Sequence, residues 1–154
     1  MYRNHPPASV LEATTVGSPV ATGPRQAMAV HIASDLQHVA RVRAAVRSAL
    51  RRWRVPQLTD DLVLMADELV ANAIRYSGSS GVEVRLQVED GIALLEVDDG
   101  ADTEPVVRQA SKVDEDGRGL FLVDALSDTW GSRSKEGGGK TVWATLAVPV
   151  AGAA

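Results

Sequence analysis

The stretch TDDLVLMADELVANAIRYSGSSGVEVRLQVEDGIALLEVDDG, residues 59–100, predicts a helix followed by a β-hairpin. In its first part, apolar residues recur at helical spacing from Leu62 to Tyr76 and would form one buried stripe. Thr59 or Asp60 can cap the N-terminus, because short polar side chains accept hydrogen bonds from the first N–H groups of a helix. This part of the chain is therefore expected to be one long amphipathic helix.

The second part of the stretch has the pattern of paired strands. After an interruption at residues 78–81, apolar and polar residues alternate over residues 82–88, which is typical of a half-buried strand. Asp90-Gly91 is a two-residue turn of the kind that hairpins prefer, and a second strand is expected over residues 92–98.

The remaining elements follow from the same patterns on either side. They are an edge strand at residues 27–32, a helix from Asp35 to Trp53 that Val55-Pro56 ends, a long loop at residues 100–116, a helix at residues 117–126, and hairpin strands at residues 129–135 and 141–148. This order predicts an α/β two-layer sandwich with helices on one face of a mixed β-sheet. We expect residues 27–150 to form this domain, with a disordered tail at 1–26 and a frayed end at 151–154.

Composition narrows the class of protein. Hydrophobic residues make up 45% and charged residues 23% of the 154 residues, as in a soluble globular domain. No apolar run approaches the ~20 residues of a membrane span, and no secretory signal pattern opens the chain. The absence of cysteine excludes disulfides and thiolate metal sites. A cytoplasmic protein is expected, and the net charge of -4 argues against nucleic acid as a direct partner.

One segment departs from this acidic balance, because six arginines crowd the first helix: Arg41, Arg43, Arg47, Arg51, Arg52 and Arg54. A solvated helix face with its aliphatic stems over the edge of the core explains them and is the favoured interpretation. The alternative is a docking face for an acidic partner.

Glu68 and Asn72 are the first candidates for a functional site. They are four residues apart, so they lie one turn apart on the same side of the predicted helix, at the rim of its apolar stripe. A carboxylate and an amide oxygen in this position suit a proton transfer and an oxygen-liganded cation such as Mg²⁺. An isolated pair of this kind is more often an exposed polar pair.

Asp98 and Gly100 are the second candidates, at the end of a predicted strand. A carboxylate there can accept a hydrogen bond from an exocyclic amine, and a glycine lets a flat base approach the backbone closely. A turn capped by aspartates gives the same pattern in many folds.

The segment Gly117-Arg118-Gly119-Leu120 lies where the long loop meets the next predicted helix. Backbone N–H groups at a helix start bind phosphate oxygens when side chains do not crowd them. A flexible helix entry is the alternative interpretation.

Gly139-Lys140-Thr141 opens the last predicted strand. It resembles the end of a P-loop, but that motif requires a glycine where Ser134 stands and a helix after it, whereas residues 141–148 alternate as a strand. The P-loop interpretation is rejected.

The order and spacing of these four segments are more specific than any one of them. Together they resemble the N, G1, G2 and final boxes of GHKL (Bergerat-fold) ATPases, over residues 27–149. Within that superfamily, ELVANAIRYS (68–77) and GRGLFLVDALSDTWG (117–131) look like the actinobacterial anti-sigma factor serine kinases. The resemblance implies a histidine-kinase-like ATPase fold that binds ATP with Mg²⁺.

The resemblance also implies a role for each matched residue. Glu68 matches the general base that takes the proton from an attacking serine hydroxyl or water, and Asn72 matches the Mg²⁺ ligand. Asp98 matches the acid that accepts the adenine amine, with Thr141 holding a bridging water. The loop at residues 100–116 corresponds to the ATP lid. The rest of the expected nucleotide-binding set is Gly100, Gly117, Arg118, Gly119 and Leu120.

Members of this group bind a sigma factor and phosphorylate a serine on a STAS-domain antagonist, and relatives often form homodimers. The leading hypothesis is therefore an ATP-dependent serine kinase and anti-sigma factor. The rival is an ATP-binding partner-switch module without significant kinase activity, which the acidic Asp114-Glu115-Asp116 favours. A histidine-kinase catalytic domain fits less well, because His5, His31 and His38 lack a phosphoacceptor context.

Overall fold

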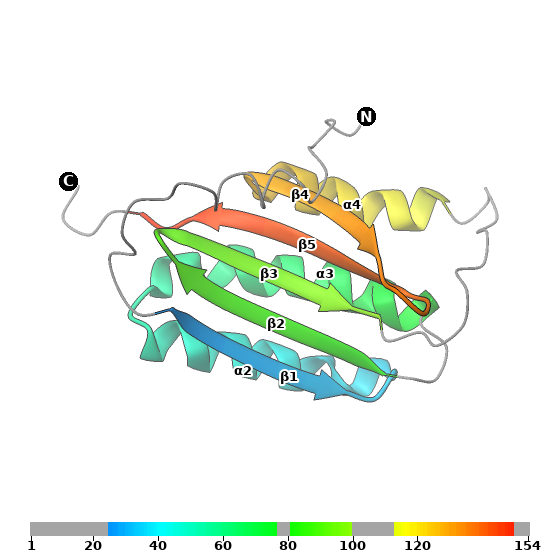
Figure 1. The fold of residues 1–154 in the computed structure, drawn as a ribbon, viewed down its shortest axis with the longest axis horizontal. Coiled ribbons are helices and arrows are strands. Elements are labelled where there is room, and N and C mark those ends of the chain that lie inside the picture. Colours follow the sequence, from blue (N-terminus) through cyan, green and yellow to red (C-terminus); the bar gives the residue numbers. More distant parts are fainter. Residues whose placement is uncertain (1–24, 77–80, 100–112, 150–154) are drawn as a thin grey trace.

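The computed structural model describes residues 25–76, 81–99 and 113–149, which form two layers. One layer is a five-stranded sheet in the order β1-β2-β3-β5-β4. The other consists of the α-helices, which lie on one face of this sheet (Figure 1). The strands are β1 (Gln26–Ile32), β2 (Val82–Glu89), β3 (Ile92–Asp98), β4 (Thr129–Ser134) and β5 (Lys140–Ala147). The helices are α2 (Val39–Arg52), α3 (Thr59–Tyr76) and α4 (Val113–Leu126), with short 3-10 turns η1 (Leu36–His38) and η2 (Pro56–Leu58).

The sandwich is as the sequence predicts, but the sheet is antiparallel rather than mixed. Every neighbouring pair of described strands is antiparallel. The chain does cross from β3 through α4 to β4, and these two strands run in the same direction (Figure 1). However, β5 inserts between them and pairs with both, so no parallel pair forms.

The central hairpin has the expected turn. Asp90 and Gly91 have φ angles of 52° and 75°, so both residues are in the left-handed region that a two-residue hairpin turn requires. The turn fixes the register of β2 on β3, with Val84 opposite Val97 and Leu86 opposite Leu95. Because side chains alternate along a strand, these residues lie on the helix-covered face and their neighbours on the other. We call that other face, on which no described helix lies, the open face.

The core fills the space between the helices and the sheet. Its fully buried side chains come from both layers and include Val46 and Leu50 of α2, Leu62 and Met65 of α3, and Leu86 and Leu95 of the sheet. The stripe predicted on α3 is thus the buried one. No helix in the described ranges is long and apolar enough to span a membrane.

Helix α2 ends in a way that the sequence alone did not indicate. The N–H of Val55 donates to the carbonyl of Leu50 (2.9 Å) and the N–H of Arg54 donates to that of Arg51 (3.1 Å), which is a Schellman motif. Arg54 takes the left-handed position of the motif, with φ of 61°, where glycine is usual.

Helix α4 begins earlier than predicted. It starts at Val113, so Gly117 and Gly119 lie inside the helix rather than at its first residue. Three acidic residues follow Val113, and acidic residues are favoured in the first turn, where they oppose the positive end of the helix dipole. The expected tail, most of the expected lid and the frayed end lie outside the described residues.

Candidate functional site

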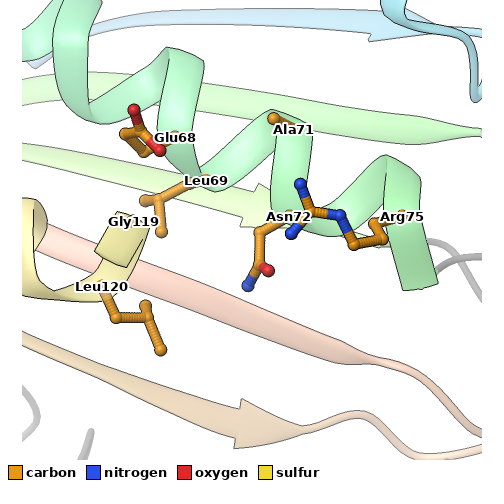
Figure 2. Close-up of a pocket in the computed structure, with 7 residues that line it drawn as sticks. All are labelled: Glu68, Leu69, Ala71, Asn72, Arg75, Gly119 and Leu120. Atoms are coloured by element: carbon orange, nitrogen blue, oxygen red, sulfur yellow. The ribbon is translucent and has the colours of Figure 1, made fainter. Parts of the chain in front are cut away.

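A small pocket lies at the contact between α3 and α4 (Figure 2). Its volume is about 40 Å³. Since one water needs roughly 10–15 Å³, there is room for a few waters, a hydrated cation or a phosphoryl group, but not for a purine. The lining residues are Glu68, Leu69, Ala71, Asn72, Arg75, Gly119 and Leu120. Four of the predicted site residues therefore meet here: Glu68, Asn72, Gly119 and Leu120.

Asn72 carries the clearest sign of a missing ligand. Its side-chain oxygen, Oδ1, is buried and accepts no hydrogen bond from any residue that the structure describes. A buried acceptor without a partner costs about 1–3 kcal/mol, so such atoms mark places where water, an ion or a ligand completes the structure. The amide oxygen is a hard donor of the type that Mg²⁺ binds.

Glu68 lies one turn before Asn72 and lines the same pocket. Among the described residues, none donates a hydrogen bond or forms an ion pair with its carboxylate. The side chain of Glu68 is only half-buried. A group that enters the pocket can therefore reach the carboxylate and transfer a proton to it.

Gly119 explains how α4 comes so close to this carboxylate. A Cβ atom placed on Gly119 would lie 2.9 Å from Oε2 of Glu68, which is closer than carbon and oxygen atoms normally approach. The end of the Glu68 side chain can move, so a larger residue here would displace the carboxylate rather than separate the helices. Gly119 thus preserves the position of Glu68.

Arg75 is a lining residue that the motif comparison missed. It lies three residues after Asn72, and its side chain runs back along α3 toward the turn of Asn72 (Figure 2). The spacing of Glu68, Asn72 and Arg75 along one helix was the available signal. Its guanidinium adds a positive charge to the pocket and suits an anionic ligand such as a phosphate group.

Asp98 lies on the open face of the sheet, not on the side of the pocket. Its carboxylate accepts hydrogen bonds from Lys135 Nζ (3.0 Å), Arg85 Nη1 (3.2 Å) and the hydroxyl of Thr141 (3.2 Å). Burial by itself would raise the pKa of Asp98, but the hydrogen bonds and charges of Lys135 and Arg85 outweigh it and lower the pKa. The carboxylate is therefore held as an anion within an ion-pair network, to which Glu96 also contributes through Arg85.

Thr141 belongs to the same network, since it pairs with Asp98 across β3 and β5. Neither residue lines the pocket between α3 and α4. Gly100 lies outside the described residues. Gly117 and Arg118 belong to α4, and the structure describes only their backbone.

A second aspartate, Asp99, follows Asp98 one residue beyond the end of β3. The alternation of β3, extended by this one residue, assigns Asp99 to the helix-covered side with Val97. Asp99 is only 6% exposed, and its Oδ1 accepts a hydrogen bond from the backbone N–H of Lys140 (3.1 Å). The alternation of β3 was the signal that could have distinguished the two aspartates.

The end of β3 carries Asp99 toward the same end of α3 as Asn72. Helix α3 packs on β3, and both figures show the arrowhead of β3 beside the C-terminal turns of α3 (Figures 1 and 2). Asn72 on α3 and the buried Asp99 after β3 thus belong to elements that meet at one end of the helix-covered face.

Residues 32–146 match the family model of the histidine kinase-like ATPase domain. The chain belongs to this family. The match covers more than half of the chain and includes every element from the end of β1 to β5, together with the pocket and both aspartates. A comparison with curated proteins found no match.

Proposed function

We propose that this ATPase domain binds ATP with Mg²⁺ and transfers the γ-phosphoryl group to a serine of a partner protein. The proposal rests on one observation. Glu68 lines the same pocket as Asn72, whose buried Oδ1 accepts no hydrogen bond from any described residue. The family supports nucleotide binding, and the pocket supplies a proton acceptor beside a cation ligand.

The residues of the pocket fit Mg²⁺ in the way this ion is usually held. No cluster of three or more acidic or histidine side chains suited to a metal exists among the described residues. Mg²⁺ instead favours one or two protein ligands, with waters and substrate phosphates completing its coordination. Asn72 would be such a ligand, and the ion would neutralise charge on the phosphates.

Glu68 would act as the general base. Its carboxylate takes the proton of the serine hydroxyl as the serine oxygen attacks the γ-phosphorus and the bond to the leaving ADP oxygen breaks. Arg75 would balance negative charge on the phosphates from the same helix, and Gly119 would keep Glu68 in position.

We assign recognition of adenine to Asp99 instead of Asp98. Asp99 is nearly buried, and the alternation of β3 assigns it to the helix-covered side, where a charged acceptor would form a strong hydrogen bond with an exocyclic amine. On the opposite face, the carboxylate of Asp98 accepts hydrogen bonds from Thr141, Lys135 and Arg85. Their positions favour a structural role.

The proposed partners are a sigma factor, which the protein would sequester, and a STAS-domain antagonist, which it would phosphorylate. These follow from the resemblance of the segments at residues 68–77 and 117–131 to anti-sigma factor kinases. Such partners act in the cytoplasm. A homodimer is also proposed from the resemblance.

The test is incubation of the purified protein with labelled ATP, Mg²⁺ and a panel of STAS-domain proteins and sigma factors from the same genome. Label on a serine of one STAS protein is the expected result. ATP binding and sigma factor binding without transfer to any STAS protein would instead identify a passive partner-switch module.

A further inference from the structure

One side of helix α2 carries a line of arginines. Arg43, Arg47 and Arg51 follow each other at intervals of four residues, so they lie on the same side of the helix, and Arg54 follows one residue beyond the C-cap Trp53. Arg43 Nη1 pairs with Asp67 Oδ1 of α3 at 3.3 Å, which shows that this side faces α3. We call these four residues the arginine stripe. It runs along the outer seam between α2 and α3, which lie side by side (Figure 1).

Most of the stripe has no partner within the described part of the chain. Arg47, Arg51 and Arg54 are exposed and form no ion pair with any described residue. Like charges one helical turn apart repel each other, while Arg51, in the last turn of α2, interacts favourably with the negative end of the helix dipole. Asp67 of α3 pairs with Arg43, but no described acidic residue pairs with Arg47, Arg51 or Arg54. Ion pairs within the described part of the chain therefore do not account for these three arginines.

Arg54 adds a second unfavourable feature at the end of the stripe. It occupies the left-handed position of the Schellman motif with φ of 61°, where a side chain crowds the backbone and glycine is preferred. Strain that the fold does not require is a reason to look for a function of the side chain. Arg54 extends the positive surface beyond the last turn of α2.

An exposed apolar residue lies next to the stripe. Only six residues join α2 to α3, so the two helices run antiparallel, and Arg47 lies along the seam toward the N-terminal half of α3. Leu64 in that half is 40% exposed, and it lies one turn before Glu68 on the outer side of α3. Leu64 thus lies on the outer side of α3, between the stripe on the α2 flank and Glu68 on the α4 flank.

We propose that this surface, the arginine stripe together with Leu64, docks the STAS-domain antagonist whose serine is phosphorylated, through a surface of that protein on which acidic side chains surround an apolar one. The inference rests on the proposed function, because docking here brings a partner's serine to the edge where Glu68 lies. A protein suits the surface better than nucleic acid does. A long polyphosphate backbone would meet the net charge of -4 of the whole molecule, whereas an acidic patch on a protein meets mainly the arginines.

The test compares two double variants with the same change of charge. Arg47→Glu/Arg51→Glu reverses the stripe, and Arg41→Glu/Arg52→Glu, on the opposite side of α2, is the matched control. Binding to each STAS-domain protein and sigma factor of the same genome is measured by calorimetry, with ATP affinity as the check that the domain is intact. We expect the stripe variant to bind its partner at least ~10-fold more weakly, since charge pairs at interfaces couple strongly. The control should bind within about twofold of wild type.

Arg54→Gly separates docking from folding. It removes one charge and the strain together, so it should raise the Tm while weakening partner binding. A variant that merely lost its fold cannot give this combination.

Four outcomes would overturn the inference. If both double variants weakened partner binding equally, the effect would come from the net charge of the protein and not from the stripe. If the stripe variant bound its partner as tightly as wild type, the partner would dock elsewhere, and the proposed function would be unaffected. Tighter binding of wild type to a 20-base-pair DNA duplex than to any panel protein, lost in the stripe variant, would make the stripe a nucleic-acid site. Binding of ATP but of no panel protein and no DNA would overturn both the docking site and the proposed partners.

Discussion

Near the end of β3, polar side chains on the open face have partners within the protein, whereas Glu68 and Asn72 on the helix-covered side lack them among the described residues. On the open face, Asp98 is held by Lys135 and Arg85, and Glu96 pairs with Arg85 and Arg133. On the helix-covered side, Glu68 has no described partner and Asn72 keeps a buried oxygen unsatisfied. The comparison teaches that neighbouring polar residues can serve opposite purposes, since paired charges stabilise the fold and unsatisfied groups indicate a ligand.

Glu68 should give the largest effect on the helix-covered side. Glu68→Gln keeps the shape of the side chain but removes the base, which acts in the transition state and contributes little to nucleotide binding. We expect phosphoryl transfer to slow by ~100-fold or more, the usual scale for a lost general base. ATP affinity by calorimetry and transfer of label to the STAS protein measure the two effects separately. Equal rates for variant and wild type would exclude Glu68 as the base.

Asp99 tests the comparison of the two faces most directly. Asp99→Asn replaces an acceptor by a donor that would face the donor of the adenine amine, at a cost of about 2 kcal/mol, or roughly 30-fold in ATP affinity. Asp98→Asn should change ATP affinity by less than about twofold, because its partners lie on the open face. The reverse order of effects in calorimetry would return the adenine contact to Asp98.

Asp98 and Asp99 also show how far the sequence could predict the site. The motif order identified the fold, the pocket residues Glu68 and Asn72, and the end of β3, because helical spacing and strand alternation are local properties. It favoured Asp98 for the adenine contact, for which we propose Asp99, because local patterns do not tell which face the helices cover. Applying the alternation one residue further, from Val97, would have favoured Asp99. The insertion of β5 between β3 and β4 could not be predicted, because it depends on long-range pairing.

Gly119 should affect function without lowering stability. Gly119→Ala adds a methyl group that would lie 2.9 Å from Glu68 Oε2 in the present geometry, so the carboxylate must move. Alanine also favours the helix by up to ~1 kcal/mol, so the Tm should not fall. Transfer should slow by about tenfold, because small displacements of a catalytic group are costly. A variant with normal transfer would show that Glu68 tolerates the shift.

Asn72 should matter only in the presence of the metal. Asn72→Ala removes the proposed ligand and should weaken ATP binding about fivefold in Mg²⁺, equivalent to ~1 kcal/mol for one polar contact. In a chelator the variant and wild type should bind alike. Losses of the same size in both conditions would indicate that the amide supports the helix rather than the ion.

A change on the open face should lower the stability of the protein and alter how that stability depends on pH. We expect this effect to be the smallest of the series. Asp98→Asn breaks the ion pairs with Lys135 and Arg85, which are partly exposed, so we expect a loss of about 0.5–1 kcal/mol in the free energy of unfolding. The same network lowers the pKa of Asp98 in the folded state. Its contribution is therefore fully present above the unfolded pKa of about 4 and is lost as the pH falls through the lower folded value. Urea unfolding of wild type and Asp98→Asn should accordingly differ at pH 7 and converge in strong acid. A constant difference between the two curves down to about pH 2 would mean that the ionised carboxylate is not what stabilises this face.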